Sequence, residues 1–167
     1  PAQFQLLAAM NPCPCGYSGH PTVPCSDTPQ QIAQYRRKLS GPLLDRFDLH
    51  VEVSSQSGAV LLSNAEPAET SLSVYQRVSL ARGRQYQRQG KLNSELKPSE
   101  LAEFCPLSPD IQKILESAMD RLALSARAAH RIVKVARTLA DLENLDNLAL
   151  RHITEALAYR GMDRRAT

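Results

Sequence analysis

The sequence predicts a mainly α-helical protein with a small α/β portion at its beginning. Prolines and cysteines are concentrated there, since six of the eleven prolines and three of the four cysteines lie within residues 1–29. Short apolar runs typical of strands occur before residue 54. From residue 71 onward apolar residues recur at helical spacing, and residues 110–160 contain no proline, which a helix interior excludes.

Two strands and one helix are expected in the first part of the chain. Residues 4–10 form an apolar run that predicts a buried strand, and residues 47–53 alternate apolar and polar side chains, which predicts a half-buried strand. A helix is expected over residues 29–39 between them. Because a strand is not stable without neighbours and Pro1 is not an initiating residue, we expect the chain to continue a longer protein that supplies strands upstream.

The expected helices of the second part cover residues 71–89, 108–122, 125–143 and 148–160. Gly90 is typical of the position just beyond a helix C-terminus, and Ser108 followed by Pro109 is typical of a helix start. The third helix has the clearest apolar stripe, formed by Ala129, Ile132, Val133, Ala136, Leu139 and Ala140. Together they predict a bundle of about four helices.

These elements divide the chain into an α/β segment with a Cys- and Pro-rich loop over residues 1–55, a linker over 56–70 and a helical domain over 71–167. The linker is predicted from its Ser, Gly, Ala and Pro content. With 43% hydrophobic residues and a net charge of +3, the composition excludes wholesale disorder. No apolar run approaches the ~18 residues of a membrane span and no signal peptide is visible, so we expect a cytoplasmic protein without a membrane partner.

The loop after the first expected strand offers a set of metal ligands. Cys13, Cys15 and Cys25 could bind zinc with His20 or Asp27 as the fourth ligand, because thiolates and imidazoles are common zinc ligands. The Cys-x-Cys spacing is tighter than that of common zinc motifs, and the sequence has no second Cys pair. The alternative is a proline-rich loop with free thiols in a reducing cytosol.

Arg46 is a candidate catalytic residue within the run LSGPLLDRFDL at residues 39–49. The expected strand that follows would hold Arg46 at its mouth. From there an arginine can reach a phosphate across a subunit boundary, where its planar charged group stabilises the transition state. The alternative is a surface ion pair with Asp45 or Asp48.

The third expected helix carries a basic face. Basic residues recur there at spacings of three and four, namely Arg127, His130 or Arg131, Lys134 and Arg137, and residues 121–137 hold no carboxylate. Such a face could contact the phosphates of a nucleotide or of nucleic acid, and the alternative is a solvated basic surface. Arg127 lies in the first turn, where the helix dipole disfavours a cation unless it serves an anion.

Several chemical signatures are missing from the sequence. It contains no G-x-x-x-x-G-K-[ST] phosphate-binding loop, no Ser/His/Asp arrangement and no dinucleotide fingerprint. Cys105 is isolated and is expected to be a small core residue. We therefore expect that this chain by itself does not hydrolyse a nucleotide.

Three motifs resemble the Mg-chelatase-related AAA+ ATPases of the ComM/YifB type. They are FQLLAAMNPCPCG at residues 4–16, LSGPLLDRFDL at 39–49, and LSAR at 124–127 with VARTLADL at 135–142. They occur in the family's order over nearly the whole chain. The resemblance implies the C-terminal end of an AAA+ core, with two strands and one helix, followed by a helical lid. The P-loop and the Walker B strand would lie upstream, in the parent protein's own AAA+ core.

The resemblance also assigns roles to three residues. Asn11 corresponds to the sensor-1 residue, which positions the attacking water near the γ-phosphate. Arg46 corresponds to the arginine finger offered to the neighbouring subunit's ATP, and Arg127 to the sensor-2 arginine of the lid. These roles imply ATP and Mg²⁺ as cofactors and a homo-oligomeric ring, a hexamer.

The family further implies a DNA motor that promotes branch migration in recombination and natural transformation. In that function the candidate DNA or phosphate contacts are Arg131, Lys134 and Arg137. The alternative is the ATPase subunit of a magnesium-chelatase-type complex that inserts a metal into a tetrapyrrole held by a partner protein. The basic helix favours DNA, because a chelatase needs a protein partner rather than a polyanion.

The cysteine loop is the place where the sequence departs from its relatives. Some relatives carry Cys-x-Cys twice, whereas the second pair here reads Cys25-Ser26-Asp27, which lowers the expectation of zinc. A third reading of the chain is a small zinc-stabilised DNA-binding module without ATPase function. It leaves Asn11, Arg46 and Arg127 unexplained as a set.

Overall fold

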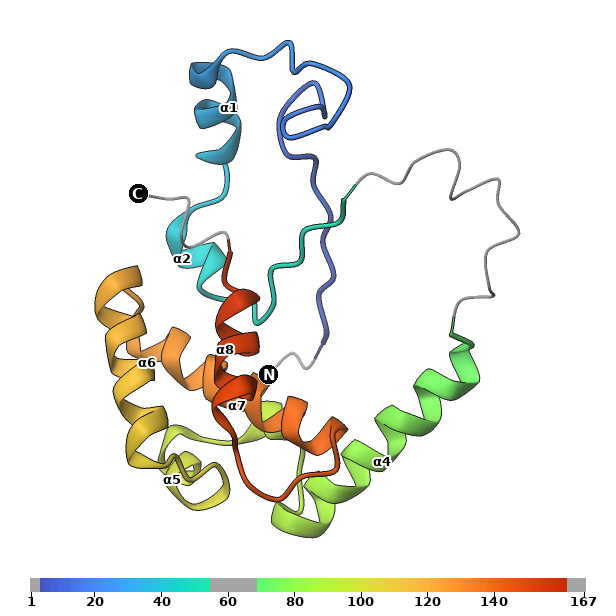
Figure 1. The fold of residues 1–167 in the computed structure, drawn as a ribbon, viewed down its shortest axis with the longest axis vertical. Coiled ribbons are helices and arrows are strands. Elements are labelled where there is room, and N and C mark those ends of the chain that lie inside the picture. The colour runs from blue at the N-terminus through green and yellow to red at the C-terminus, as the bar shows by residue number, and fades with distance from the viewer. Residues whose placement is uncertain (1–3, 55–68, 162–167) are drawn as a thin grey trace. The chain divides into compact units, whose positions relative to one another are not determined.

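The computed structural model describes residues 4–54 and 69–161 (Figure 1). The chain forms two compact units, Pro1–Ser40 and Gly41–Thr167. The expected linker over residues 56–70 lies almost entirely outside the described residues. The prediction of a mainly helical chain is confirmed, since every regular element of the described residues is a helix.

The first unit contains a long loop followed by helix α1, Pro29–Arg36. A capping box starts the helix: the Thr28 hydroxyl accepts a hydrogen bond from the Gln31 N–H, and the Gln31 side chain accepts one from the Thr28 N–H. The helix ends before the expected residue 39. There the N–H groups of Lys38 and Leu39 bond carbonyls three residues earlier, which tightens the chain into turns.

The two expected strands do not form in the described residues. Residues 4–10 are exposed along their whole length, with Leu7 82% exposed. Residues 47–53 leave the side chains of Val51 and Val53 in solvent. A strand needs the backbone groups of a neighbouring strand as partners, and no segment described here offers them. The prediction of two strands is therefore corrected: both segments are irregular.

The second unit is a bundle of helices. It begins with α2, Gly41–Leu44, and continues with α4, Ser71–Gln89. Three short elements follow: η1, Asn93–Glu95, η2, Pro98–Glu100, and α5, Leu101–Phe104. The last helices are α6, Pro109–Leu122, α7, Ala126–Leu142, and α8, Leu150–Ala158. The four helices expected in this region are thus confirmed, with ends within two residues of the prediction.

The short elements η1, η2 and α5 were not expected. They form because two carboxylates tighten the chain locally: Glu95 accepts the Leu92 N–H at 2.8 Å and Glu100 accepts the Lys97 N–H at 2.6 Å. Leu101, which is 7% exposed, anchors the segment in the core. The elements are too short for a periodic apolar pattern to reveal them.

Local signals start and end the longer helices. Thr70, Ser108 and Ser125 each cap a helix by accepting a hydrogen bond from the backbone N–H three residues ahead. Gly90 ends α4 in the left-handed conformation at φ 71°, as its lack of a side chain allows. Ala123 ends α6 in the same region at φ 47°, where a Cβ is unfavourable.

Helix α7 lies at the centre of the bundle and packs against α4, α5 and α8 (Figure 1). The predicted stripe of α7 faces the core: Ile132 is 1% exposed, Ala140 is 0% exposed and Leu139 is partly buried. The other elements add Leu96, Leu101, Cys105, Ile111, Leu115, Ala118, Leu148, Ile153, Ala156 and Leu157 to this core. Burial of these apolar surfaces is the main force that holds the bundle together. None of the helices described here is long and apolar enough to cross a membrane.

Candidate functional site

Residues 44–48, with the sequence LDRFD, are fastened to the C-terminal helices of the second unit. The Asp45 carboxylate accepts a hydrogen bond from the Ser125 hydroxyl at 2.9 Å and forms an ion pair with Arg160 at 3.4 Å. Arg160 is fully buried and also donates to the Phe47 carbonyl at 2.6 Å. Ser125 and Arg160 therefore hold Asp45 and Phe47, the two residues that flank Arg46.

Two further contacts continue this attachment. Asp48 forms an ion pair with Arg131 on α7. The backbone N–H of His50 donates to the carbonyl of Tyr159, just after α8, at 2.7 Å. Residues 44–50 are thus connected to α7 and to the end of α8, although their own backbone forms no strand.

Arg46 is exposed, and its guanidinium donates to the Pro42 carbonyl at 2.6 Å. The alternative of an ion pair with Asp45 or Asp48 does not hold, because those carboxylates pair with Arg160 and Arg131 instead. Among the residues that the structure describes, no carboxylate pairs with Arg46. Most of its N–H donors are therefore open to an anion from outside the unit.

Arg127 lies in the first turn of α7 and is also exposed. It makes no hydrogen bond or ion pair within residues 4–54 and 69–161, which leaves its charge without an internal partner. A cation at this position is unfavourable to the helix dipole. Arg127 therefore carries a positive charge at a helix start that no described residue neutralises, which is the property that singled it out in the sequence.

The Ser125 hydroxyl joins these two arginine motifs. It donates to Asp45, 80 residues away in sequence, and it accepts the Ala128 N–H at 3.1 Å as the cap of α7. Arg46 follows Asp45 directly, and Arg127 lies two residues beyond Ser125. One hydroxyl thus fixes the start of α7 to the residue next to Arg46, a link that the sequence did not reveal.

The remaining residues of the basic face are engaged within the fold. Arg131 pairs with Asp48, and Lys134 donates to the Ser94 carbonyl at 3.0 Å. Burial lowers the pKa of Lys134, and the charge of Arg131 lowers it further. Arg137 is 1% exposed, so it lies in the interior rather than on a surface that DNA could reach. Arg131 and Lys134 are thus paired within the fold and Arg137 is buried, so these three side chains do not form an open basic patch.

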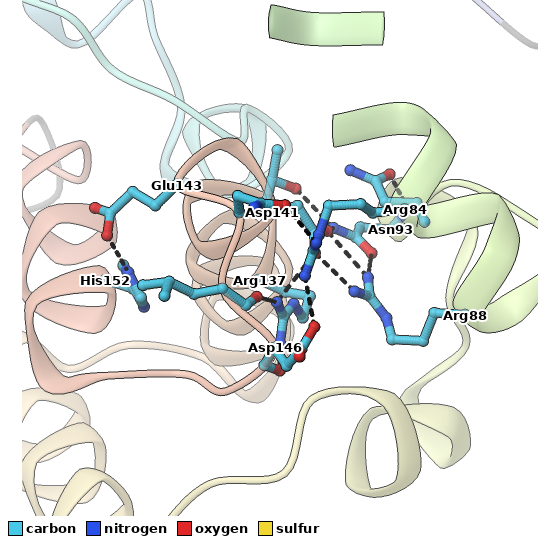
Figure 2. A network of polar contacts seen from close by, with 12 residues as sticks. Arg84, Arg88, Asn93, Arg137, Asp141, Glu143, Asp146 and His152 are labelled. Atoms are coloured by element: carbon cyan, nitrogen blue, oxygen red, sulfur yellow. Dashed lines mark hydrogen bonds and ion pairs between the residues drawn. The ribbon is translucent and has the colours of Figure 1, made fainter. Parts of the chain in front are cut away.

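Arg137 belongs to a buried polar network around Asp141 (Figure 2). Arg88 of α4 donates to both oxygens of Asp141, at 2.6 and 3.0 Å, and Asn93 donates to one of them at 2.9 Å. Arg137 donates to the same carboxylate at 3.0 Å from one turn earlier on α7. The motif at residues 135–142 therefore ties α4, η1 and α7 together. Its signal in the sequence was the four-residue spacing of opposite charges.

Asp141 remains ionised in this environment. Burial raises the pKa of its carboxyl, but the hydrogen bonds from Arg88 and Asn93 and the charge of Arg137 lower it more strongly. The net pKa lies below the usual range. Two guanidinium groups around one carboxylate explain this direction, since opposite charges at short range favour the charged form.

In the first unit, three cysteines lie close together. The ligand atoms of Cys13, Cys15, Cys25 and Asp27 all lie within 4.8 Å of one another. The distances between sulfur atoms are 3.4 Å for Cys13 and Cys15, 3.6 Å for Cys13 and Cys25, and 3.4 Å for Cys15 and Cys25. Cys105 is remote in sequence and lies in the helical core, as predicted.

His20 does not join this cluster, and Asp27 takes the fourth place. The His20 Nδ1 accepts the backbone N–H groups of Thr22 at 3.2 Å and Val23 at 3.0 Å, so His20 shapes a turn. The Cys15 N–H donates to Asp27 Oδ2 at 2.8 Å and holds the pKa of that carboxyl below its usual range.

Asn11 lies at the start of the cysteine loop and is exposed. Its side-chain nitrogen would lie 3.8 Å from a Cβ added at Gly16, which adopts a φ of +85°. Asn11 belongs to the first unit, whereas Arg46 and Arg127 belong to the second. The structure therefore brings the two arginine motifs together within the second unit, while Asn11 belongs to the first.

Family models match both parts of the chain. The model described as magnesium chelatase, subunit ChlI C-terminal, matches residues 68–160, and the model described as magnesium chelatase, subunit ChlI, matches residues 1–61. Arg127 falls in the former match, and Asn11 and Arg46 fall in the latter.

Curated relatives align with nearly the whole chain. Competence protein ComM of Haemophilus influenzae is 45% identical over 165 residues, and YifB of Salmonella typhimurium is 44% identical over 164 residues. Rv2897c of Mycobacterium tuberculosis is 37% identical over 166 residues. The alignments cover 98%, 98% and 96% of this chain but 32% of each relative. The chain thus spans about a third of the length of these relatives.

Proposed function

Because the chain belongs to the magnesium chelatase ChlI family, we propose that it is the C-terminal part of an AAA+ ATPase. In this proposal residues 1–55 end the ATPase core and residues 71–167 form its helical lid. ATP and Mg²⁺ bind in the larger protein, whose preceding residues supply the P-loop and the Walker B strand. The chain by itself is expected to be inactive, because it lacks both.

The observation that carries this proposal is an exposed Arg46 guanidinium between two carboxylates that are already paired with other residues. An arginine without an internal anion is available to an external one, and its planar donors match phosphate oxygens. As an arginine finger, Arg46 would reach the ATP of a neighbouring subunit. There it would stabilise the charge that develops on the γ-phosphoryl oxygens, an effect worth roughly 10³–10⁵ in kcat.

Arg127 and Asn11 complete the proposed set. Arg127 would contact the γ-phosphate as the sensor-2 arginine, and the Ser125–Asp45 hydrogen bond would link its helix to the finger segment. Asn11 would orient the attacking water as the sensor-1 residue. Charge stabilisation and water positioning account for most of the catalysis of phosphoryl transfer. A finger supplied by a neighbour also makes hydrolysis depend on assembly, for which we propose a hexameric ring.

Substitution of the two arginines in the protein that contains this chain tests these roles. Arg46→Ala should lower ATP turnover by roughly 10³-fold or more while ATP binding stays nearly intact, because a finger acts mainly in the transition state. Arg127→Ala should lower both turnover and ATP affinity. Arg82→Ala is the matched control, since Arg82 is exposed on α4 and has no partner among the described residues. Unchanged turnover in Arg46→Ala would overturn the finger assignment.

Subunit mixing tests whether Arg46 serves a neighbouring site. Arg46→Ala subunits are combined with subunits whose P-loop is inactivated. In a mixed ring, some interfaces pair an intact P-loop with an intact Arg46, so two inactive proteins should recover ATP turnover together. Failure to recover, with mixed rings demonstrated by mass, would assign Arg46 to its own subunit's nucleotide.

We further propose that the ATPase acts on DNA, driving branch migration in recombination and natural transformation. The support is 45% identity to a relative named as a competence protein. Arg131, Lys134 and Arg137 add no support, because they are engaged within the fold. The DNA contacts would then lie in other parts of the protein.

The family description favours a second candidate, an ATPase subunit of a metal-insertion complex that acts on a tetrapyrrole and a partner protein. ATP turnover of the protein that contains this chain separates the two. Titration with branched or single-stranded DNA should raise turnover if the protein is a DNA motor. A flat response to both DNAs would favour metal insertion.

A further inference from the structure

We propose that Cys13, Cys15, Cys25 and Asp27 bind one zinc ion, which holds the loop of the first unit in shape. None of these four side chains contributes to the nucleotide chemistry proposed above. The inference is therefore independent of the ATPase function and is tested separately from it.

The spacing of the ligand atoms fits a tetrahedral metal site. The three sulfur atoms form a nearly equilateral triangle with sides of 3.4, 3.6 and 3.4 Å. Zinc bound to thiolates at about 2.3 Å in tetrahedral geometry places the sulfurs about 3.8 Å apart. A small expansion of the triangle formed by Cys13, Cys15 and Cys25 would therefore accommodate the ion, with a carboxylate oxygen of Asp27 in reach of the fourth position.

The backbone around the cluster supports the ligands. The Cys15 N–H donates to Asp27 Oδ2 at 2.8 Å and orients the carboxylate, while the Ser18 N–H donates to the Cys13 sulfur at 3.3 Å. Hydrogen bonds of this kind orient metal ligands and stabilise thiolate charge. Gly16 donates to the Cys13 carbonyl at 3.1 Å with a φ of +85°, which closes the turn that brings Cys13 and Cys15 onto one side.

The described residues of the first unit bury very little. Among its described residues, Cys13 alone is buried, so an apolar core is missing. The cysteines also form no disulfide. Units this small without a core usually depend on a disulfide, a metal or a partner. A metal whose binding energy contributes directly to folding would account for an ordered loop with a single buried side chain.

The donor set indicates zinc and distinguishes Asp27 from His20. Three soft thiolates favour zinc over magnesium or calcium, which prefer oxygen ligands. His20 Nδ1 accepts two backbone N–H groups and is held away from the cluster. The site is therefore a Cys₃Asp set, in which Asp27 occupies the position of a fourth thiolate.

Metal analysis of the whole chain, purified with reductant, tests the site. One zinc per chain is expected, and Co²⁺ in its place should give sulfur-to-cobalt charge-transfer bands together with the visible bands of tetrahedral cobalt. Cys13→Ser and Cys25→Ser should lose the metal. Cys105→Ser is the matched control and should keep one equivalent, because Cys105 lies in the helical core.

Variants at Asp27 and His20 test the fourth ligand without relying on loss of folding. Asp27→Cys should bind zinc more tightly than the original chain in competition with a chromophoric chelator, because it completes four thiolates. Asp27→Ala should weaken binding, and His20→Ala should leave it unchanged. If His20→Ala lost the metal while Asp27→Ala kept it, the assignment of Asp27 would be overturned.

Either of two results would overturn the proposal of a zinc site. If the reduced chain carries no zinc and added Co²⁺ produces no charge-transfer band, the cysteines are free thiols. Equal metal contents in Cys13→Ser and Cys105→Ser would also overturn the proposal, since only Cys13 belongs to the cluster.

Discussion

In the first unit of this chain the one buried side chain among the described residues is a cysteine, whereas the helical unit buries an apolar core and a charged network. The contents of the two interiors differ in physical kind. Burial of apolar area is insensitive to chelators and depends on packing. A thiol and carboxylate cluster depends on its ion and on the charge state of its ligands. Each unit should therefore respond to conditions that leave the other unchanged.

Removal of metal should produce the largest contrast. Under reducing conditions a strong zinc chelator is expected to abolish amide protection throughout residues 11–28. The described part of this loop buries no apolar core that could keep it folded without the metal. The amides of α6, α7 and α8 should keep their protection. Hydrogen exchange measured by mass spectrometry distinguishes the segments. Equal loss of protection in both units would show that they unfold together and would break the comparison.

Removal of the Asp141 carboxylate should produce the next largest effect, confined to the helical unit. Asp141→Ala leaves the buried Arg137 charge without its anion, which is expected to cost about 3–5 kcal/mol of unfolding free energy. Urea denaturation followed by circular dichroism measures it.

Asp146→Ala is the matched control for this variant. Its side chain is 93% exposed and pairs with Arg84 at 2.5 Å, and a surface pair contributes about 0–1 kcal/mol. Metal content of the first unit should be the same in both variants. A destabilisation as small for Asp141→Ala as for Asp146→Ala would mean that the network in Figure 2 adds little to stability.

Acid should have a smaller and graded effect on the helical unit. The pKa of Asp141 is lowered in the folded state, and the pKa of Glu143 is lowered to about 2 by hydrogen bonds from Arg151 and then His152. A carboxyl with a depressed folded-state pKa contributes stability above its unfolded pKa of about 4, and this is lost as the pH falls toward the folded value. Unfolding free energy should therefore decline below about pH 4.

Charge-neutral variants sharpen this test. Asp141→Asn should flatten the dependence of the unfolding free energy on pH between 5 and 2, because one of the two groups no longer titrates. Glu116→Gln, an exposed substitution on α6, serves as the control and should keep the slope of the original chain. An identical slope in Asp141→Asn would assign the acid sensitivity to other groups.

Local signals allowed the helices to be predicted, but the same reasoning failed for the strands. Ser125 caps α7 and Gly90 ends α4 through interactions within a few residues, so neighbouring residues in the sequence determine these helix boundaries. The apolar pattern at residues 47–53 is just as clear. A strand, however, is completed by a neighbour, and no described segment supplies one. A helix pairs its backbone N–H and C=O groups within its own segment, whereas a strand needs those of a neighbouring strand.

The candidate sites divide in the same way. The sequence singled out Cys13, Cys15 and Cys25, but the choice between His20 and Asp27 depended on where the loop returns to the cluster. The basic face of α7 looked continuous along the helix. Lys134 donates to the Ser94 carbonyl, a pairing with a distant residue that no local pattern reveals. Arg137 is buried beside Asp141, four residues further along the same helix.

The sequence by itself determined the helical character of the second unit, its caps and its apolar stripe, because those properties depend on residues within one or two turns. It also determined which residue types carry chemistry. Only the tertiary structure decided which charges stay available: Asp45 and Asp48 pair with Arg160 and Arg131, so neither neutralises the exposed Arg46. Long-range pairing depends on how helices pack, and packing joins residues that the order of the chain keeps far apart.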